Sequence, residues 1–300
     1  MEISGARVVI TRDTLAGTML KLEESCPTIE RVVTVGDGGP VPVNGCLRFE
    51  DMISVESDGA RVEKSNYVSG LLLFSSGTTG PPKGVMLSHS ALSTNLLQYS
   101  AGIRERLRQP STDGRWQERL LAVLPFFHIY GMTSLLNYGM FGGCHTMVLP
   151  KFNPPTFTAA LRQHRPTFLP LVPSLISFLV NDSQVFPEDF KDLHTILTAG
   201  SPFGQSLRDQ FKAKYGDSIA IMENYGLTEM PFTHIFAVSL QKSGDHAGSV
   251  GQPLVSTLTK IIDMRDGKAL PSFQTGEICM KGPQVSGTKT KIWPPNTFTI

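Results

Sequence analysis

Residues 71–85 read LLLFSSGTTGPPKGV, an apolar run followed at once by hydroxyl side chains, glycines and Lys83. Glycine lets a backbone approach a ligand closely, hydroxyls donate to oxyanions, and lysine adds a positive charge for the same group. The apolar run predicts a buried strand over 71–74, and 88–99 reads as the helix that follows the loop. The stretch therefore predicts a phosphate-binding loop at the carboxyl end of a strand, where open α/β sheets place ligands.

A P-loop is one alternative interpretation of this stretch. That motif has the pattern G-x-x-x-x-G-K-[ST]. Counted from Gly77, its second glycine position holds Pro82 and its hydroxyl position holds Gly84, so the pattern fails twice. The adjacent prolines also restrict a helix that would start there. A turn rich in glycine and hydroxyls, without any ligand, is the other alternative.

The composition is that of an ordinary globular protein. Of the 300 residues, 40% are hydrophobic and 18% charged, which is enough to bury a large core. The net charge of +1 gives no basic surface for nucleic acid. No stretch is apolar enough for a membrane span, and the first residues lack the apolar centre of a signal peptide. The cysteines are widely spaced and form no CxxC pair, so a reduced compartment is the default. The histidines show no ligand spacing, and no zinc site is expected.

Short β-like runs alternate with helical stretches over most of the chain, which indicates an α/β fold. Beyond Gly248 the helical pattern stops, and antiparallel strands are expected on both sides of a turn at 265–268. The expected strands are 6–11, 31–35, 120–124, 144–149, 167–171, 196–198, 218–222, 257–263 and 277–281; the expected helices are 15–24, 133–140 and 156–164, with a turn at 37–40.

Further motifs follow the glycine-rich stretch in a fixed order. They are LPFFHIYG at 124–131, LPKF at 149–152, TAGSP at 198–202, NYGLTE at 224–229, GSVG at 248–251 and TGEI at 275–278. Together with the loop at 74–85, this series resembles the AMP-forming acyl-adenylating superfamily, which includes acyl-CoA synthetases, 4-coumarate-CoA ligases and luciferases. The resemblance covers residues 2–287.

The resemblance implies an incomplete large amino-terminal domain of that α/β fold, with layered subdomains. Its parts would be a partial first subdomain at 1–70, a subdomain with the ATP and acyl site at 71–247, a partial β-rich subdomain at 248–287 and a segment outside the family at 288–300. The family's ribose-binding aspartate motif and its carboxyl-terminal lid domain with a catalytic lysine have no match in this sequence.

The resemblance also implies ATP, Mg²⁺ and coenzyme A as cofactors. Thr228 would contact the α-phosphate and Glu229 would hold Mg²⁺, which favours one or two carboxylates plus phosphate oxygens. Lys151 matches a lysine that contacts CoA phosphate, although a plain surface lysine is an equal alternative. The β- and γ-phosphates would be surrounded by Ser75, Ser76, Gly77, Thr78, Thr79, Gly80 and Lys83, and the adenine pocket would be lined by Glu223, Asn224 and Tyr225.

For the acid substrate, the resemblance implies His128 near the acyl carboxylate and Tyr130 and Ser201 beside the acyl group. The catalytic set would be His128, Thr228, Glu229 and Lys83. A lone histidine beside aromatic residues is more often a core residue, but the flanking motif favours the functional interpretation. Ser201 replaces the alanine usual in 4-coumarate-CoA ligases, and Glu223-Asn224 replaces Gln-Gly, so the substrate of those ligases does not transfer directly to this chain. The aromatic and small residues Phe126, Tyr130, Ser201 and Phe232 are compatible with an aromatic or a fatty acid.

The expected function is that of an ATP-dependent acid-CoA ligase similar to 4-coumarate-CoA ligases, with activity impaired by the unmatched lysine. The alternative is a catalytically dead nucleotide-binding fragment, or one that regulates a full-length relative by pairing with it. Whether the chain is itself an enzyme stays open at this stage. The expected location is the cytoplasm by default, with the peroxisome as the alternative for a full-length parent.

Overall fold

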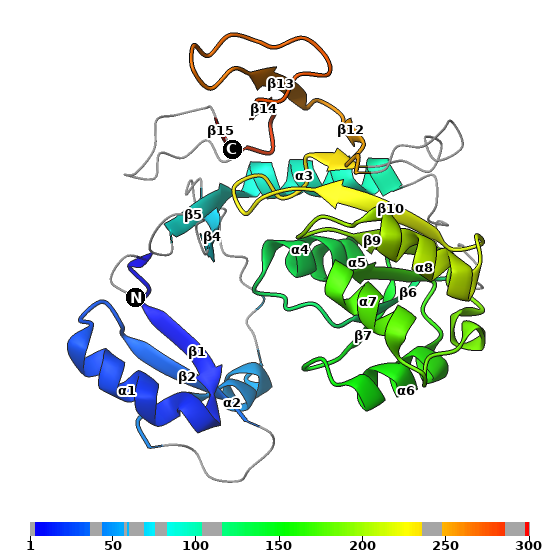
Figure 1. Cartoon of the computed structure of the whole chain (residues 1–300). Coiled ribbons are helices and arrows are strands. Elements are labelled where there is room, and N and C mark those ends of the chain that lie inside the picture. Colours follow the sequence, from blue (N-terminus) through cyan, green and yellow to red (C-terminus); the bar gives the residue numbers. More distant parts are fainter. Residues whose placement is uncertain are drawn as a thin grey trace. The chain divides into compact units, whose positions relative to one another are not determined.

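The computed structural model describes residues 4–36, 44–56, 59, 69–75, 83–103, 116–235, 248–285 and 298–299. These residues belong to two compact units, 1–67 and 68–300 (Figure 1). The predicted turn at 37–40 and residues 76–82 of the glycine-rich stretch lie outside the described residues. The finer division of the chain into subdomains stays a prediction.

The first unit holds a small parallel sheet with the order β1-β2-β3 in its described part. The strand, helix and strand predicted between 6 and 35 are confirmed. Val9, Cys26, Ile29 and Val32 form the core between the sheet and the first helix. The elements are β1 (Val8–Arg12), η2 (Asp13–Leu15), α1 (Ala16–Ser25), β2 (Arg31–Val35), β3 (Leu47–Arg48) and α2 (Phe49–Ser54).

The second unit is built on a larger sheet whose order, within the described residues, is β12-β11-β10-β9-β8-β6-β7. The strands from β10 to β7 in this order are parallel, whereas β11 and β12 are antiparallel additions at one side. The strands are β6 (Arg119–Ala122), β7 (His145–Val148), β8 (Phe168–Leu171), β9 (Thr195–Thr198), β10 (Ala220–Tyr225), β11 (His234–Ile235) and β12 (Gln252–Pro253).

Helices connect the parallel strands on both faces of this sheet. The chain steps from β6 outward to β7, then returns past β6 to β8, β9 and β10, so the strand order reverses between β6 and β8. Right-handed crossovers therefore place α4 (Ile129–Gly131), the π-helical η3 (Met132–Asn137) and α5 (Tyr138–Phe141) on one face. On the other face lie α6 (Pro154–His164), α7 (Pro173–Asn181) and α8 (Gln205–Tyr215), which Figure 1 shows packed together.

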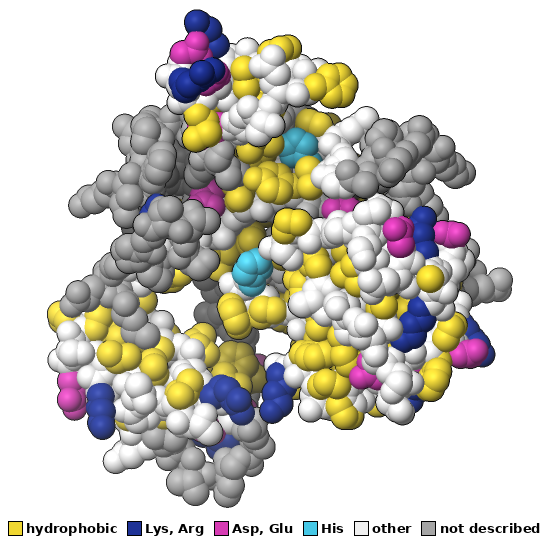
Figure 2. Space-filling view, viewed as in Figure 1, with side chains coloured by type: hydrophobic (Ala, Val, Ile, Leu, Met, Phe, Trp, Pro, Cys, Tyr) yellow, Lys and Arg dark blue, Asp and Glu magenta, His cyan; other side chains and the backbone are white. Residues whose placement is uncertain are grey.

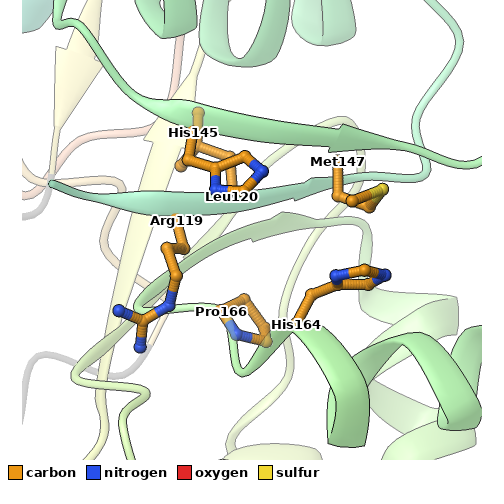
Figure 3. Close-up of a pocket in the computed structure, with 6 residues that line it drawn as sticks. All are labelled: Arg119, Leu120, His145, Met147, His164 and Pro166. Atoms are coloured by element: carbon orange, nitrogen blue, oxygen red, sulfur yellow. The ribbon is translucent and has the colours of Figure 1, made fainter.

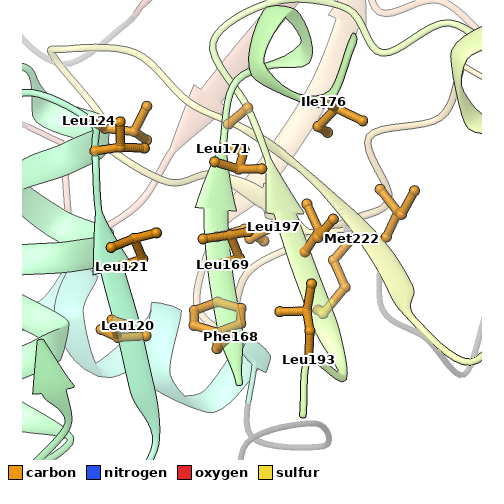
Figure 4. Close-up of a cluster of buried hydrophobic side chains, with 14 of the residues drawn as sticks. Leu120, Leu121, Leu124, Phe168, Leu169, Leu171, Ile176, Leu193, Leu197 and Met222 are labelled. Atoms are coloured by element: carbon orange, nitrogen blue, oxygen red, sulfur yellow. The ribbon is translucent and has the colours of Figure 1, made fainter. Parts of the chain in front are cut away.

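The core of the second unit lies between the parallel strands and these helices. Apolar residues of β6, β8 and β9, among them Leu121, Leu169 and Leu197, are fully buried (Figure 4). Such near-continuous apolar strands are typical of a parallel sheet that is covered on both faces. Ring contacts join Phe157 of α6 to Phe178 of α7 on one side of the sheet.

The glycine-rich stretch begins and ends in a hairpin separate from the parallel sheet. In the described residues, β4 (Ser69–Ser75) pairs antiparallel with β5 (Lys83–Ser88), and α3 (His89–Ile103) follows. The strand predicted at 71–74 is therefore present, and the glycine-rich stretch follows its carboxyl end as expected. The strand belongs to this hairpin, however, and not to an open parallel sheet. It is also not a fully buried strand, because Phe74 is 53% exposed.

The β-rich part after residue 248 contains the expected antiparallel pair, β13 (Leu258–Ile262) and β14 (Glu277–Lys281). Gly267 has a left-handed φ of 70° and donates its N–H to Asp263 O at 2.8 Å, which closes the predicted turn. β15 (Phe298–Thr299) pairs with β14 on its other side.

Buried amide side chains of α3 tie this β-rich part to the sheet. Asn95 donates to Phe232 O at 2.8 Å and accepts from Phe232 N–H at 3.2 Å. Gln98 donates to Val255 O, and Gln284 lies between Gln98 and Thr257. Because buried polar groups need partners, these bonds fix α3 against both segments.

Candidate functional site

The predicted site residues follow the carboxyl ends of several parallel strands. His128 comes after β6, Lys151 after β7 and Ser201 after β9, while Tyr225 ends β10. Because parallel strands end at the same edge of a sheet, these residues are brought to one edge. That edge includes the reversal of strand order between β6 and β8, where open α/β sheets bind ligands.

His128 is an exposed residue that caps the start of α4. Its Nδ1 accepts the Tyr130 N–H at 3.2 Å, and a neutral ring that accepts at Nδ1 carries its proton on Nε2. The turn needs glycine at 131, because a Cβ there would lie 2.4 Å from Pro125 O. His128 is thus oriented by its own helix start and presents an Nε2–H donor at the edge.

Tyr130 is buried beneath this edge. Its hydroxyl lies 2.8 Å from Leu197 O and 3.2 Å from Leu171 O. Leu197 is the last residue but one of β9, and Leu171 is the last residue of β8. Burial raises the pKa of this hydroxyl well above its usual range. Tyr130 also meets the Phe232 ring edge to face at 6.0 Å, so it holds strand ends together as well as bordering the predicted acyl region.

Ser201 is exposed in the bend after β9. Gly200 has a φ of 89°, a left-handed conformation that suits glycine and turns the chain at the strand end. Just before it, the Thr198 hydroxyl is buried without a partner among the described residues. The end of β9 therefore carries hydroxyl groups, of which Ser201 faces solvent.

Thr228 and Glu229 form the tip of a tight turn after β10. Leu227 and Met230 exchange backbone hydrogen bonds of 3.0 and 3.2 Å, so the two residues between them project from the turn, both partly exposed. Gly226 is required here, because a Cβ would lie 1.8 Å from the backbone oxygen of Pro231. Glu229 is partly exposed at the tip of this turn, where its carboxylate can serve as an oxygen ligand.

Glu223 and Asn224 are buried neighbours whose side chains lie on opposite faces of β10, as successive strand residues do. Glu223 accepts a hydrogen bond from Arg208 of α8. Burial raises the pKa of the Glu223 carboxyl, and Arg208 opposes that rise. Asn224 is 5% exposed, and neither atom of its amide has a partner in the described part of the chain.

The ends of the glycine-rich stretch are held together by the hairpin. Ser75 and Lys83 are Cα partners at the point where β4 ends and β5 begins. Leu73 and Val85 pack with Ile129, the residue after His128, in a separate apolar cluster. The hairpin is therefore docked on the helix that His128 caps; residues 76–80 lie outside the described residues.

A shallow hollow lies at the opposite edge of the sheet (Figure 3). Arg119 and His145, the first residues of β6 and β7, line it together with Leu120, Met147, His164 and Pro166.

The described residues contain no group of three or more histidine, cysteine or acidic side chains that could hold a metal ion. On the face seen in Figure 2, basic and acidic side chains are interspersed over α6, α7 and α8 and form no single-sign patch there.

Arg208 and Asn95 support the segments at the edge that carries His128, Ser201 and Tyr225, although the sequence patterns did not identify them. Each acts through a partner distant in sequence, Glu223 and Phe232 respectively. Arg208 lies on a helix whose Leu207, Phe211 and Tyr215 recur at helical spacing, a pattern that predicts the helix but not the ion pair.

Among the described helices, none is long and apolar enough to span a bilayer.

A parallel sheet with this edge, a docked glycine-rich hairpin and a β-rich extension defines the amino-terminal domain of acyl-adenylating enzymes. ATP-bound MatB from Rhodopseudomonas palustris has the same fold, with a TM-score of 0.77 and 24% identity over 94% of this chain and 52% of that chain. The N-terminal domain of FACL13 from Mycobacterium tuberculosis gives a TM-score of 0.73 and 22% identity over 95% of this chain and 66% of that chain.

The AMP-binding enzyme family matches residues 1–288, and the chain belongs to this family. It is 30% identical over 286 residues to 4-coumarate–CoA ligase 3 of Oryza sativa subsp. japonica. This alignment covers 95% of the chain and 50% of the relative. The chain thus spans about half the length of the curated relatives it matches.

Proposed function

We propose that the chain carries the ATP- and acid-binding site of an AMP-forming acid–CoA ligase similar to the 4-coumarate–CoA ligases. The proposed reaction joins a carboxylate to the α-phosphate of ATP with release of pyrophosphate, and then transfers the acyl group to CoA with release of AMP. The observation that carries the proposal is the arrangement of His128, Ser201 and the Thr228–Glu229 turn along one edge of a parallel sheet.

The phosphate groups would be held between the hairpin and the Thr228–Glu229 turn. Ser75 and Lys83 bracket the glycine-rich stretch, and a lysine ammonium there would neutralise phosphate charge. Glu229 would hold Mg²⁺, which its partly exposed carboxylate at the tip of a turn suits. Mg²⁺, when bound, supplies neutralisation of the charge on the phosphate oxygens.

The nucleobase would lie at the end of β10. Within the described part of the chain, the Asn224 amide has an unused donor and an unused acceptor, which together complement the amino group and a ring nitrogen of adenine. Tyr225, partly buried at the strand end, would offer its ring for stacking. These two residues support adenine as the base at this end of the site.

The acid would lie between His128 and the end of β9. The Nε2–H of His128 would donate to the acyl carboxylate, with the ring orientation set by the Tyr130 N–H. Beyond the carboxylate, Tyr130 and Phe232 provide aromatic surface, which supports an aromatic or fatty acid. Lys151, exposed after β7 at the same edge, would meet a phosphate of CoA.

Calorimetry with ATP·Mg²⁺ on the purified chain tests the proposal. Saturable binding is expected for the unsubstituted chain, with loss of binding in Lys83→Ala and Glu229→Ala, because each removes a charge that would act on the phosphates or the metal. Lys260→Ala, an exposed lysine on β13, is the matched control and should bind normally. A folded chain without saturable ATP binding contradicts the proposal.

Pyrophosphate release with a panel of aromatic and fatty acids then tests the acid half of the site. A single methylene changes selectivity in an apolar pocket by about 1–3 kcal/mol, so several chain lengths are needed. Pyrophosphate release with any acid supports the ligase reaction. ATP binding without release from any acid would favour the alternative, a nucleotide-binding module that acts by pairing with a longer relative.

A further inference from the structure

Glu223 is a buried carboxylate on the strand that ends in Asn224 and Tyr225. Its side chain is 8% exposed, and Arg208 Nη2 lies 2.5 Å from its Oε1. The side chain of Arg208 is itself 14% exposed. Both charges are thus largely removed from water, where a carboxylate depends on its partner to stay ionised.

Arg208 contacts β10 at a second point. Its Nη1 donates to Ile221 O at 3.3 Å, so the guanidinium contacts two residues of β10 that are two positions apart. Phe203 lies under the guanidinium, with the Arg208 Cζ 5.0 Å from the ring centroid. The planar group is therefore fixed between α8 and the last residues of β10.

The position of Arg208 relates this pair to the site. α8 begins after the carboxyl end of β9, and Arg208 lies in its first turn, so the pair lies near the edge that carries Ser201 and Tyr225. Among the described residues, Arg208 is the charged group that acts on Glu223. Its removal would leave an uncompensated buried charge on Glu223, the residue before Asn224 on β10.

We propose that Arg208 is a positioning residue for the nucleobase end of the site: by pairing with Glu223 it fixes the last residues of β10, so that Asn224 and Tyr225 are held ready for adenine. This inference rests on the proposed function. Arg208 does not contact the ligand itself, and its effect on nucleotide binding passes through Glu223.

A second ion pair allows a matched comparison. Arg162 of α6 contacts both carboxylate oxygens of Asp189, at 2.9 and 3.3 Å. α6 ends before the amino end of β8, so this pair lies at the opposite edge of the sheet. Loss of Arg162 should change stability without changing nucleotide binding.

The test measures the Kd for ATP·Mg²⁺ by calorimetry at pH 6 and pH 8, together with thermal unfolding. Residues that orient metal ligands typically change metal affinity by about 10- to 100-fold when they are removed, and by analogy Arg208→Met is expected to raise the Kd by at least about tenfold. The loss should become smaller as the pH falls, because burial raises the pKa of the Glu223 carboxyl and protonation removes the unpaired charge. The double variant Arg208→Met/Glu223→Gln should recover most of the affinity at both pH values.

Arg162→Met should lower the unfolding temperature and leave Kd unchanged. If Arg208→Met does not fold, Arg208→Lys carries the test, since it keeps the charge and loses the two-point contact; weaker ATP binding is then expected at both pH values. Wild-type affinity in a folded Arg208 variant, or a double variant as weak as Arg208→Met, overturns the inference and leaves the proposed function standing. No ATP binding by the unsubstituted chain overturns both.

Discussion

At the scale of single residues, Tyr130 shows how a side chain can support a site from below. Its hydroxyl reaches the backbone of both β8 and β9 near their carboxyl ends, which lie on either side of the predicted acyl region. Without that hydroxyl, the carbonyls of Leu171 and Leu197 lose a buried donor. The same residue that would border the substrate therefore also sets the spacing of the strands around it.

Tyr130→Phe tests this role. An unsatisfied buried polar group costs about 1–3 kcal/mol, so the free energy of unfolding in urea should fall by roughly that amount. The control is Tyr99→Phe, because the buried Tyr99 hydroxyl has no partner among the described residues and its removal should be neutral or stabilising. Equal stability of both variants would show that the Tyr130 hydroxyl does not hold the strand ends.

Residues of the site differ in how far the sequence predicts them. His128, Ser201, Thr228 and Glu229 lie in short runs whose glycines and hydroxyls mark turns, and the structure brings their turns to one edge. Arg208 has no such local signal, because its function depends on a partner on β10 that only the packing of α8 supplies. Sequence patterns identify turn residues well and long-range pairs poorly.

At the scale of elements, two of the unpredicted segments carried a usable pattern. In β5, Val85 and Leu87 are buried at alternate positions, a strand period hidden within the glycine-rich motif. In α8, Leu207, Phe211 and Tyr215 follow the helical period. By contrast, the helix expected at 133–140 is divided into η3 and α5, and no local pattern in MTSLLN distinguishes a π-helix from an α-helix.

His234 links β11 to the β-rich part and makes that link dependent on pH. It is buried, with Nδ1 2.9 Å from Thr233 Oγ1 and Nε2 3.2 Å from Thr259 Oγ1. Burial lowers its pKa from the usual 6.5, so the unfolded chain binds a proton that the folded chain resists. The contribution of His234 to stability is therefore present above pH 6.5 and is lost as the pH falls below it toward the lowered value.

His234→Gln should reduce that pH dependence. The difference in unfolding free energy between pH 8 and pH 5, measured by urea denaturation, should be smaller in the variant than in the unsubstituted chain. His145→Gln serves as the control, because His145 is exposed at the start of β7. An unchanged difference in His234→Gln would exclude His234 as the source.

At the scale of the whole molecule, α3 joins the parts of the second unit. Its Asn95 pairs with both backbone groups of Phe232, a few residues after the Thr228–Glu229 turn, and its Gln98 reaches the segment that leads into β13. The order of motifs along the chain predicted the sheet and the β-rich part. It could not predict this connection, because amides in a helix indicate neither their direction nor their partner.

Asn95→Leu should loosen the segment that follows the turn. It would leave the buried N–H and C=O of Phe232 without their partners, each at a cost of about 1–3 kcal/mol. Hydrogen exchange at the Phe232 amide should become faster, and ATP binding should weaken because Glu229 lies on the same segment. Leu97→Asn, at an exposed position of the same helix, is the control. Unchanged protection of Phe232 in Asn95→Leu would contradict this role.

The reversal of strand order also has a consequence for how the chain folds. β6 comes first among the parallel strands yet lies between two later ones, so the strands that follow it along the chain are added on both of its sides. His128 and Ser201 follow β6 and β9, whereas Glu229 follows β10, so the edge is complete only when β10 is in place. A ligand that needs both sides of the edge would bind only the finished sheet, and by mass action it would draw partly folded chains toward completion.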